Sequence, residues 1–231
     1  MDFLEPIDKR IHKPKKIKSF KSAQIKYENA EELISKISLT KNARIFTFIP
    51  GNFIFGDLIE ALVVKNNYHI KEMTISTLSL SGPNVDSLNN LLNGDYVDKL
   101  TLIVSDYFYS HEKWKLIQYI YKTLDLNKTQ LSVYRGHAKV CIFETYNGLK
   151  VVMHGSANLR SSDNIEQIDI EENEQIFDYI SEFYTKIALE QKTIKKCHQD
   201  DKVQRVKAGK TQQKKGTRKE KNEHKINYLT I

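Results

Sequence analysis

The stretch Tyr134–Gln167, YRGHAKVCIFETYNGLKVVMHGSANLRSSDNIEQ, gathers an imidazole, an ammonium, a hydroxyl, an amide and two carboxylates. Two apolar runs within it, VCIFETY and LKVVMHG, flank Asn147-Gly148, a strong short-range signal for a two-residue hairpin turn. A hairpin of these runs brings its open ends side by side. The pattern therefore predicts a cluster of reactive groups at one end of an apolar hairpin.

Two basic side chains stand just before the first run. His137 and Lys139 are two residues apart, so on the expected strand both side chains project from the same face. An imidazole titrates near neutral pH, which suits it to act as a nucleophile or as a general acid or base. The ammonium of Lys139 adds a positive charge beside it, which favours an anionic substrate.

Small polar residues stand just after the second run. Ser156 and Asn158 are also two residues apart, and they offer a hydroxyl and an amide to the same anion. The neighbouring glycines, Gly136 and Gly155, allow the backbone to approach a ligand closely. Donors and cations that converge on one point are typical of an oxyanion or phosphate site.

Strands and helices are expected to alternate along the rest of the chain. This alternation, with the late hairpin, predicts an α/β fold in which a mixed β-sheet is flanked by helices. In such sheets ligands gather at the carboxyl ends of the strands. Asn84 or Asp86 is the expected cap of the third helix. The expected elements are strands at 43–49, 70–80, 99–105 and 130–134 and helices at 28–38, 53–64, 84–92, 111–124 and 173–191.

Charge is unevenly distributed along the chain. Residues 8–26 carry eight Lys or Arg and one Asp, and residues 192–225 carry thirteen Lys or Arg and four acids. Residues 27–191 carry fifteen Lys or Arg and twenty-two acids, a net charge of −7. The sequence therefore predicts a basic N-terminal arm at 1–27 and a basic, disordered tail at 192–231. Such arms either aid solubility or neutralise the phosphates of a polyanion.

Composition excludes several protein classes. No apolar run approaches the length of a membrane span, and the first residues lack the apolar segment of a secretory signal. Cys141 and Cys197 are expected to be free thiols, which suits a cytoplasmic location, and the chain lacks the ligand spacing of a zinc site. The segment 51–57, GNFIFGD, lacks the lysine of a phosphate-binding loop. No metal and no cofactor are expected.

Taken together and in order, the residues of the opening stretch resemble the HKD signature of the phospholipase D superfamily. That signature is His-x-Lys, four further residues, Asp, and then Gly-Ser-x-Asn, and the small bacterial nucleases of the superfamily add a downstream Asn-x-Glu. In this sequence Glu144 stands in place of the Asp, and ten residues around Asn147-Gly148 separate it from Gly155. The matching positions are His137, Lys139, Glu144, Gly155, Ser156, Asn158, Asn164 and Glu166.

The resemblance implies a phospholipase D-like α/β/α sandwich over residues 28–191 and a metal-independent phosphodiester transfer. His137 would attack phosphorus and form a covalent phosphohistidine, while a second histidine protonates the leaving oxygen. Lys139 and Asn158 would hold the non-bridging oxygens, and Glu166 would orient the His137 ring. The implied catalytic residues are His137, Lys139, Ser156, Asn158 and Glu166, with Glu144, Gly155 and Asn164 as supporting residues.

The superfamily needs two copies of the motif for one active site, and this chain has one. The other candidate, His69-Ile70-Lys71, has the local spacing, but the following Gly82-Pro83-Asn84 is not Gly-Ser-x-Asn. The resemblance therefore implies a homodimer in which two copies complete one site about a twofold axis.

The leading hypothesis is a hydrolase that cleaves nucleic acid, because basic arms suit a phosphate backbone without sequence readout. DNA is expected in preference to RNA. Two alternatives remain open. One is a phospholipase-type lipid phosphodiesterase whose arms meet an anionic membrane surface. The other is a non-catalytic nucleic-acid-binding module on the same fold. No transmembrane segment is expected in any of these cases.

Overall fold

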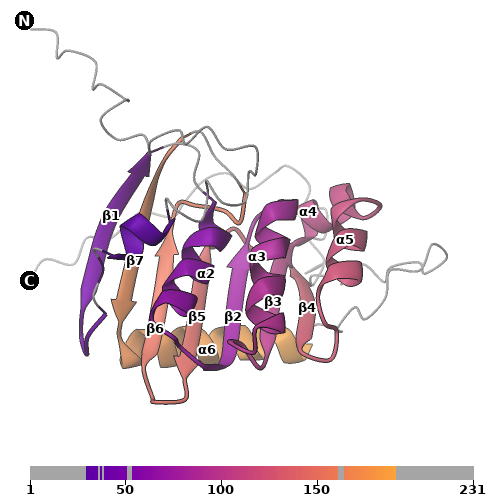
Figure 1. Ribbon diagram of the computed structural model, residues 1–231. Coiled ribbons are helices and arrows are strands. Elements are labelled where there is room, and N and C mark those ends of the chain that lie inside the picture. The colour runs from indigo at the N-terminus through magenta and orange to yellow at the C-terminus, as the bar shows by residue number, and fades with distance from the viewer. Residues whose placement is uncertain (1–29, 36, 38, 51–53, 161–163, 191–231) are drawn as a thin grey trace, which may run out of the picture.

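A computed structural model describes residues 30–35, 37, 39–50, 54–160 and 164–190 of the chain. The basic arms expected at 1–27 and 192–231 lie outside these residues, and the helix expected at 28–38 is described in part, with residues 30–35 helical. The elements shown in Figure 1 are β1 (Arg44–Pro50), α2 (Phe55–Lys65), β2 (Ile70–Thr77), α3 (Gly82–Asn93), β3 (Leu100–Ser105), α4 (Asp106–Glu112), α5 (Leu116–Thr123), β4 (Thr129–Tyr134), β5 (Val140–Thr145), β6 (Lys150–Gly155), β7 (Ile165–Glu172) and α6 (Glu174–Glu190).

The strands form one mixed sheet in the order β1-β7-β6-β5-β2-β3-β4. Strands β2, β3 and β4 are parallel to one another, whereas all other neighbours pair antiparallel. The ends of β2, β3, β4 and β6 therefore lie at the same edge of the sheet as the starts of β5 and β7. We call this the upper edge, as it is drawn in Figure 1, and the opposite one the lower edge. The predicted α/β fold with a mixed sheet and flanking helices is confirmed.

Helices cover the two faces of the sheet differently (Figure 1). Helices α2, α3 and α5 lie on one face, where they form a large core with strand residues such as Met73, Leu102 and Phe143. Helix α6 crosses the opposite face, where Phe177 and Tyr184 pack against apolar residues of the sheet. Both faces thus bury apolar side chains, as a layered α/β domain requires.

Part of the second face carries exposed apolar residues. Phe46 and Phe48 alternate with the inward residues of β1 and are 54% and 61% exposed. Ile165, at the start of β7 on the same face, is 60% exposed. Beside them Arg44 Nε donates to the two carboxylate oxygens of buried Asp169 at 3.1 and 3.0 Å. We call the surface formed by Phe46, Phe48 and Ile165 the open face.

The β5–β6 hairpin forms as predicted, but its loop is not the expected two-residue turn. The loop is Tyr146–Gly148, because Thr145 N donates to Leu149 O at 3.0 Å. Gly148 has a φ of +84°, whereas Asn147 is not among the residues with positive φ. A three-residue hairpin loop commonly ends in such a left-handed residue, so the need for glycine falls on one position.

Two helices also differ from expectation. The helix expected at 111–124 is divided between α4 and α5, because Lys115 has φ −122° and ψ −83°, outside the helical region. Helix α3 has Ser81 as its N-cap instead of Asn84. The side chain of Asn84 is buried in the first turn, where Oδ1 accepts a hydrogen bond from Gly56 N at 2.7 Å and joins α3 to α2.

The sequence analysis does not predict β7. Acidic residues interrupt its apolar pattern, although Ile168 and Ile170 are fully buried. The acids are satisfied by groups far away in the sequence: Asp169 by Arg44, and Glu172 by the backbone N–H of Asn42 at 2.6 Å. This strand carries Glu166, one of the predicted site residues, to the upper edge.

Candidate active site

The upper edge of the sheet brings together most of the site residues that the sequence predicts. Residues 135–139 run from the end of β4 to the start of β5, and they cross the ends of β2 and β3, which lie between those strands. Ser76 Oγ, near the end of β2, donates to Ala138 O at 3.3 Å and holds this segment. Residues 155–158 leave β6 at the same edge, and Glu166 enters it on β7.

His137 and Lys139 contact each other, but they do not lie on a strand as predicted, because β5 begins at Val140. Lys139 Nζ donates to His137 Nδ1 and to His137 O, both at 3.1 Å. Burial lowers the pKa of Lys139, and the negative charge of Glu166 acts in the opposite direction. An ammonium thus lies directly against an exposed imidazole, and a carboxylate is near enough to influence it.

Gly155 is required by the approach of two backbones. A Cβ atom at this position would lie 2.0 Å from Gln167 O, so any other residue would force β6 and β7 apart. The close approach at Gly155 is to the neighbouring strand β7, and Gly136 shows no such contact, so the approach to a ligand stays a prediction for both glycines. A Cβ at Gly136 would meet its nearest neighbour, Tyr134 Cδ1, at an ordinary 3.5 Å.

Ser156 and Glu166 are joined by this approach. Ser156 N donates to Gln167 O at 3.0 Å, and Gln167 N donates to Ser156 Oγ at 2.9 Å. Ser156 Oγ in turn donates to Glu166 Oε2. The partner that the structure gives Glu166 is therefore Ser156, whereas the sequence analysis assigned it to His137.

Asn158 presents an amide at the same edge. The next residue, Leu159, is fixed to the end of β2, because its N–H donates to Thr77 Oγ1 at 3.2 Å and its carbonyl accepts from Ser81 N at 2.8 Å. Asn158 Oδ1 is buried, and within the described part of the chain no group donates a hydrogen bond to it. A backbone fixed by hydrogen bonds on the C-terminal side of Asn158 thus holds an amide whose oxygen has no hydrogen-bond donor among the described residues.

Comparison with known proteins identifies this architecture. Neither a protein-family model nor a curated protein matches the sequence. The structure of Nuc from Salmonella typhimurium, a phospholipase D family member, matches with a TM-score of 0.50 at 14% sequence identity. That match covers 68% of this chain and 100% of Nuc. The chain has a phospholipase D fold.

Two further structures are similar at lower scores. Phosphatidylserine synthase from Haemophilus influenzae Rd KW20 matches at 15% identity with a TM-score of 0.49, over 67% of this chain and 40% of that chain. NucT from Helicobacter pylori matches at 13% identity with a TM-score of 0.46, over 65% of this chain and 99% of that chain. At such identities the likeness concerns the fold, and the roles of residues depend on the geometry described above.

Glu144, a predicted supporting residue, and His69, from the other His-x-Lys, both lie away from the upper edge of this phospholipase D fold. Glu144 is near the lower end of β5, where its carboxylate accepts from Lys71 Nζ at 3.1 Å. His69, from the rejected second motif, is also at the lower edge and stacks on Tyr96. Asn164 directly precedes β7 and is exposed at the upper edge. Glu144 therefore supports the sheet and does not line the site.

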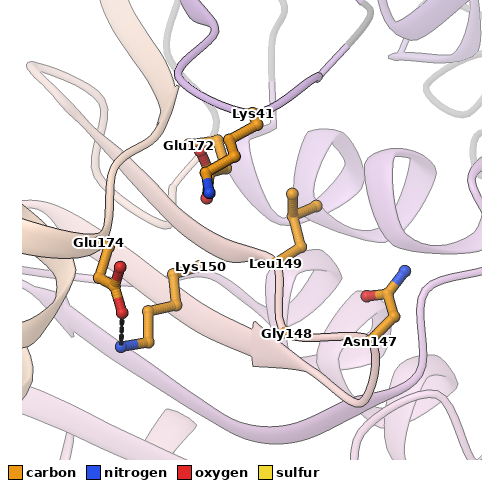
Figure 2. A pocket seen from close by; sticks show the side chains of 7 residues that line it. All are labelled: Lys41, Asn147, Gly148, Leu149, Lys150, Glu172 and Glu174. Carbon is orange, nitrogen blue, oxygen red and sulfur yellow. Dashed lines mark hydrogen bonds and ion pairs between the residues drawn. The ribbon is translucent and has the colours of Figure 1, made fainter.

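A polar pocket of about 310 Å³ lies at the lower edge, beside the hairpin loop (Figure 2). Figure 2 shows Lys150 directed toward Glu174, whose Oε1 is 3.0 Å from Nζ. The same Nζ donates to Asp178 Oδ1 at 2.7 Å. These charges neutralise each other and are remote from His137. The pocket is lined by Lys41, Asn147, Gly148, Leu149, Lys150, Glu172 and Glu174.

Two residues that hold the site are missed by the sequence analysis. Ser76 holds the segment of His137, and Gln167 binds Ser156 through its backbone. Ser76 could not be singled out, because Thr74, Thr77 and Ser79 are polar residues of the same stretch. No signal could reveal the second, because any residue except proline has the same backbone groups.

In the described part of the chain, no helix is both long and apolar enough to cross a membrane.

Proposed function

We propose that this chain is a metal-independent phosphodiesterase that cleaves nucleic acid through a covalent phosphohistidine at His137. The observation that carries the proposal is the 3.1 Å contact between Lys139 Nζ and His137 Nδ1 at the upper edge. Together the pair offers a nucleophile and a cation to one phosphate, and Asn158 offers an amide beside them. The Ser156 hydroxyl and the Glu166 carboxylate complete the set.

The reaction begins with attack of a His137 ring nitrogen on phosphorus. A P–N bond forms, the P–O bond to the leaving oxygen breaks, and a second imidazolium gives that oxygen its proton. Water then attacks the phosphohistidine, its proton passes to the second imidazole, and the P–N bond breaks. Lys139 and Asn158 stabilise the non-bridging oxygens in both steps.

The hydrogen bond from Lys139 has a consequence for the tautomer of His137. An ammonium that donates to Nδ1 leaves the neutral ring protonated at Nε2, so Nε2 is a proton donor in the free enzyme. When a substrate phosphate draws Lys139 away, the exposed ring exchanges its proton with water, which takes the Nε2 proton and protonates Nδ1. Nε2 is then free to attack, and Nδ1–H donates to an acceptor that we assign to Glu166.

The basic arms support nucleic acid as the substrate. The thirteen Lys or Arg of residues 192–225 and the eight of residues 8–26 suit a polymer of phosphates, with DNA in preference to RNA. Cleavage of DNA, RNA and phosphatidylglycerol vesicles should be compared in EDTA. Fastest turnover of the vesicles would favour the lipid alternative instead.

The catalytic test uses two matched histidines. His137→Ala should abolish cleavage in EDTA, whereas His69→Ala, from the other His-x-Lys at the lower edge, should retain it. Base-stable, acid-labile phosphate should be trapped on His137 during turnover. Cleavage that requires a metal, or that survives in His137→Ala, would contradict the mechanism. Binding without any cleavage would favour a non-catalytic module.

We further propose that a homodimer completes the site, since the mechanism needs a second imidazole. Exposed apolar surface supports this. Ile176, Tyr179 and Phe183 form an exposed stripe along the outer side of α6, on the same side of the sheet as the open face. With the open face, these side chains present roughly 500 Å² of apolar surface, against about 800 Å² per partner in a stable interface.

Mixing experiments test the shared site. If both His137 rings serve one site, equal amounts of wild type and His137→Ala, allowed to exchange subunits, should show about a quarter of the wild-type activity. Independent sites would give about half. Phe48→Ser should shift the mass by light scattering toward the monomer with parallel loss of activity. Tyr146→Ser, an exposed aromatic at the lower edge, is the matched control.

A further inference from the structure

Three aromatic rings lie in a row on α4 and the turn that follows it. Tyr107 and His111 are four residues apart and share one side of α4, and Trp114 follows in the turn after the helix. Tyr107 is 65% exposed and Trp114 57%, and His111 is exposed between them. We call this row the aromatic stripe.

The stripe is held in place by its own contacts and by the opposite side of α4. Phe108 and Tyr109 are buried in the core, and Ser105 Oγ caps the helix by accepting from Phe108 N at 3.0 Å. The rings of Tyr107 and His111 lie 4.0 Å apart at 32°, and His111 Nδ1 donates to Tyr107 O at 2.7 Å. The exposed rings therefore start from a fixed helix and lose little freedom on binding a ligand.

The stripe begins beside the candidate active site. Ser105 of β3 and Tyr134 of β4 are opposite each other at the upper edge. The chain enters α4 directly after Ser105, and it enters the His137 segment directly after Tyr134. Tyr107 and His137 are thus two and three residues beyond one hydrogen-bonded pair of strands. Figure 1 shows α4 at this edge, above β3.

The surroundings of the stripe distinguish it from the apolar surface on α6. Lys113 Nζ lies 4.7 Å from the centre of the Trp114 ring, and exposed Lys115 follows. Exposed Arg135 begins the segment that leads to His137. Acids are present too, but Asp106 is turned to its own helix, where it accepts from Tyr107 N. Aromatic faces beside cations are the combination that binds unpaired bases and their phosphates.

We propose that the aromatic stripe stacks the unpaired bases of a single-stranded nucleic acid and leads its backbone to His137. This names the substrate of the proposed function as single-stranded, and it rests on that function for the choice of nucleic acid. Stacking tolerates any base, because every base has a flat face. In a duplex the same faces are covered by neighbouring bases, so the stripe would discriminate by strandedness and not by sequence.

The chain supplies its own reporter, because Trp114 is its single tryptophan. Full-length His137→Ala, which should bind without cleaving, is titrated with an oligothymidylate, an abasic oligomer of equal length and a duplex. Binding is followed by anisotropy and stacking by tryptophan fluorescence. We expect saturable quenching by oligothymidylate, with little quenching by the abasic oligomer or the duplex at equal occupancy. Equal quenching by the abasic oligomer, or binding of oligothymidylate without quenching, would overturn the proposal.

A second variant removes one ring without touching the reporter. Tyr107→Ala should raise the Kd for oligothymidylate by roughly tenfold and leave the salt dependence of binding unchanged, since no phosphate contact is lost. Tyr146→Ala should leave the Kd unchanged. An unaltered Kd for Tyr107→Ala would count against stacking. If oligothymidylate quenches the fluorescence but the wild type does not cleave it, the stacking proposal stands and the catalytic proposal fails. If the wild type cleaves but no quenching occurs, the catalytic proposal stands and the stacking proposal fails.

Discussion

A lysine of the β5–β6 hairpin, Lys150, and one just before it, Lys139, have opposite surroundings. Lys150, at the lower edge, donates to Glu174 at 3.0 Å and to Asp178 at 2.7 Å. These hydrogen bonds, the one to Asp178 most of all, raise the pKa of Lys150 to about 12. Lys139, at the upper edge, has an imidazole as its closest partner, and burial lowers its pKa. The charge of Lys150 is paired within the fold, whereas no carboxylate in the described part of the chain forms an ion pair with Lys139. The two lysines therefore carry the same charge and differ in whether carboxylates of the fold neutralise it.

The largest expected effect is on kcat and comes from removing the charge of Lys139. Lys139→Met should reduce kcat by roughly 10²–10³-fold, because a charge that stabilises phosphate oxygens in the transition state is lost. Lys150→Met should leave kcat unchanged. Steady-state kinetics on one oligonucleotide would measure both. Equal effects of the two substitutions would show that the surroundings of the lysines do not separate their roles.

The next effect concerns the backbone that supports the upper edge. Gly155→Ala should lower the free energy of unfolding by about 3 kcal/mol, since its Cβ would overlap Gln167 O. Gly136→Ala, where the space is ordinary, should change it by less than about 0.5 kcal/mol. Urea denaturation gives both values. A tolerated Gly155→Ala would mean that β6 and β7 separate easily and that the edge is not rigid.

A pH profile sharpens the contrast between the lysines. The pKa of Lys139 is lowered from 10.5, so its proton leaves before that of an ordinary lysine. The alkaline fall of kcat/KM should therefore begin below pH 10.5, and Lys139→Arg should move it to higher pH. In the window between the folded and the unfolded pKa the unfolded chain holds more protons, so this residue adds stability as pH rises. An unchanged alkaline limb in Lys139→Arg would assign the fall to another group.

The smallest effect is expected at the lower edge. Glu144→Gln removes a half-exposed ion pair with Lys71 and should lower the free energy of unfolding by about 0.5 kcal/mol. Cleavage should be unaffected, because Glu144 lies at the far end of β5 from His137. Thermal unfolding and an activity assay would test this together. A tenfold loss of activity would require a link along β5 that the contacts do not provide.

The hairpin and the mixed sheet could be predicted because their signals are local. Two apolar runs identify β5 and β6, and Asn147-Gly148 marks the turn between them. Strand β7 could not be predicted in this way. Asp169 and Glu172 resemble surface residues until Arg44 and Asn42, more than a hundred positions earlier, come to satisfy them.

The sequence could predict that Ser156 and Glu166 would come together at the upper edge, but not which groups they would contact there. Spacing selected Ser156 and Glu166 as site residues, but their mutual hydrogen bond depends on how β6 meets β7. The contact of Lys139 with His137 arises in an irregular segment, whereas the spacing argument assumed a strand. Such segments take their shape from tertiary contacts, here the bond from Ser76 to Ala138 O.

Because β1 pairs with β7, the sheet can be completed only after most of the chain has been synthesised. In the described sheet β1 is an outermost strand, and the strand it pairs with, β7, is the last in sequence. During synthesis β1 must wait for more than a hundred residues before that partner appears, and such distant pairing slows folding. The same strand delivers Glu166 and Gln167 to the upper edge. A nascent chain therefore cannot bring Glu166 and Gln167 beside Ser156 before β7 has been made and has joined the sheet.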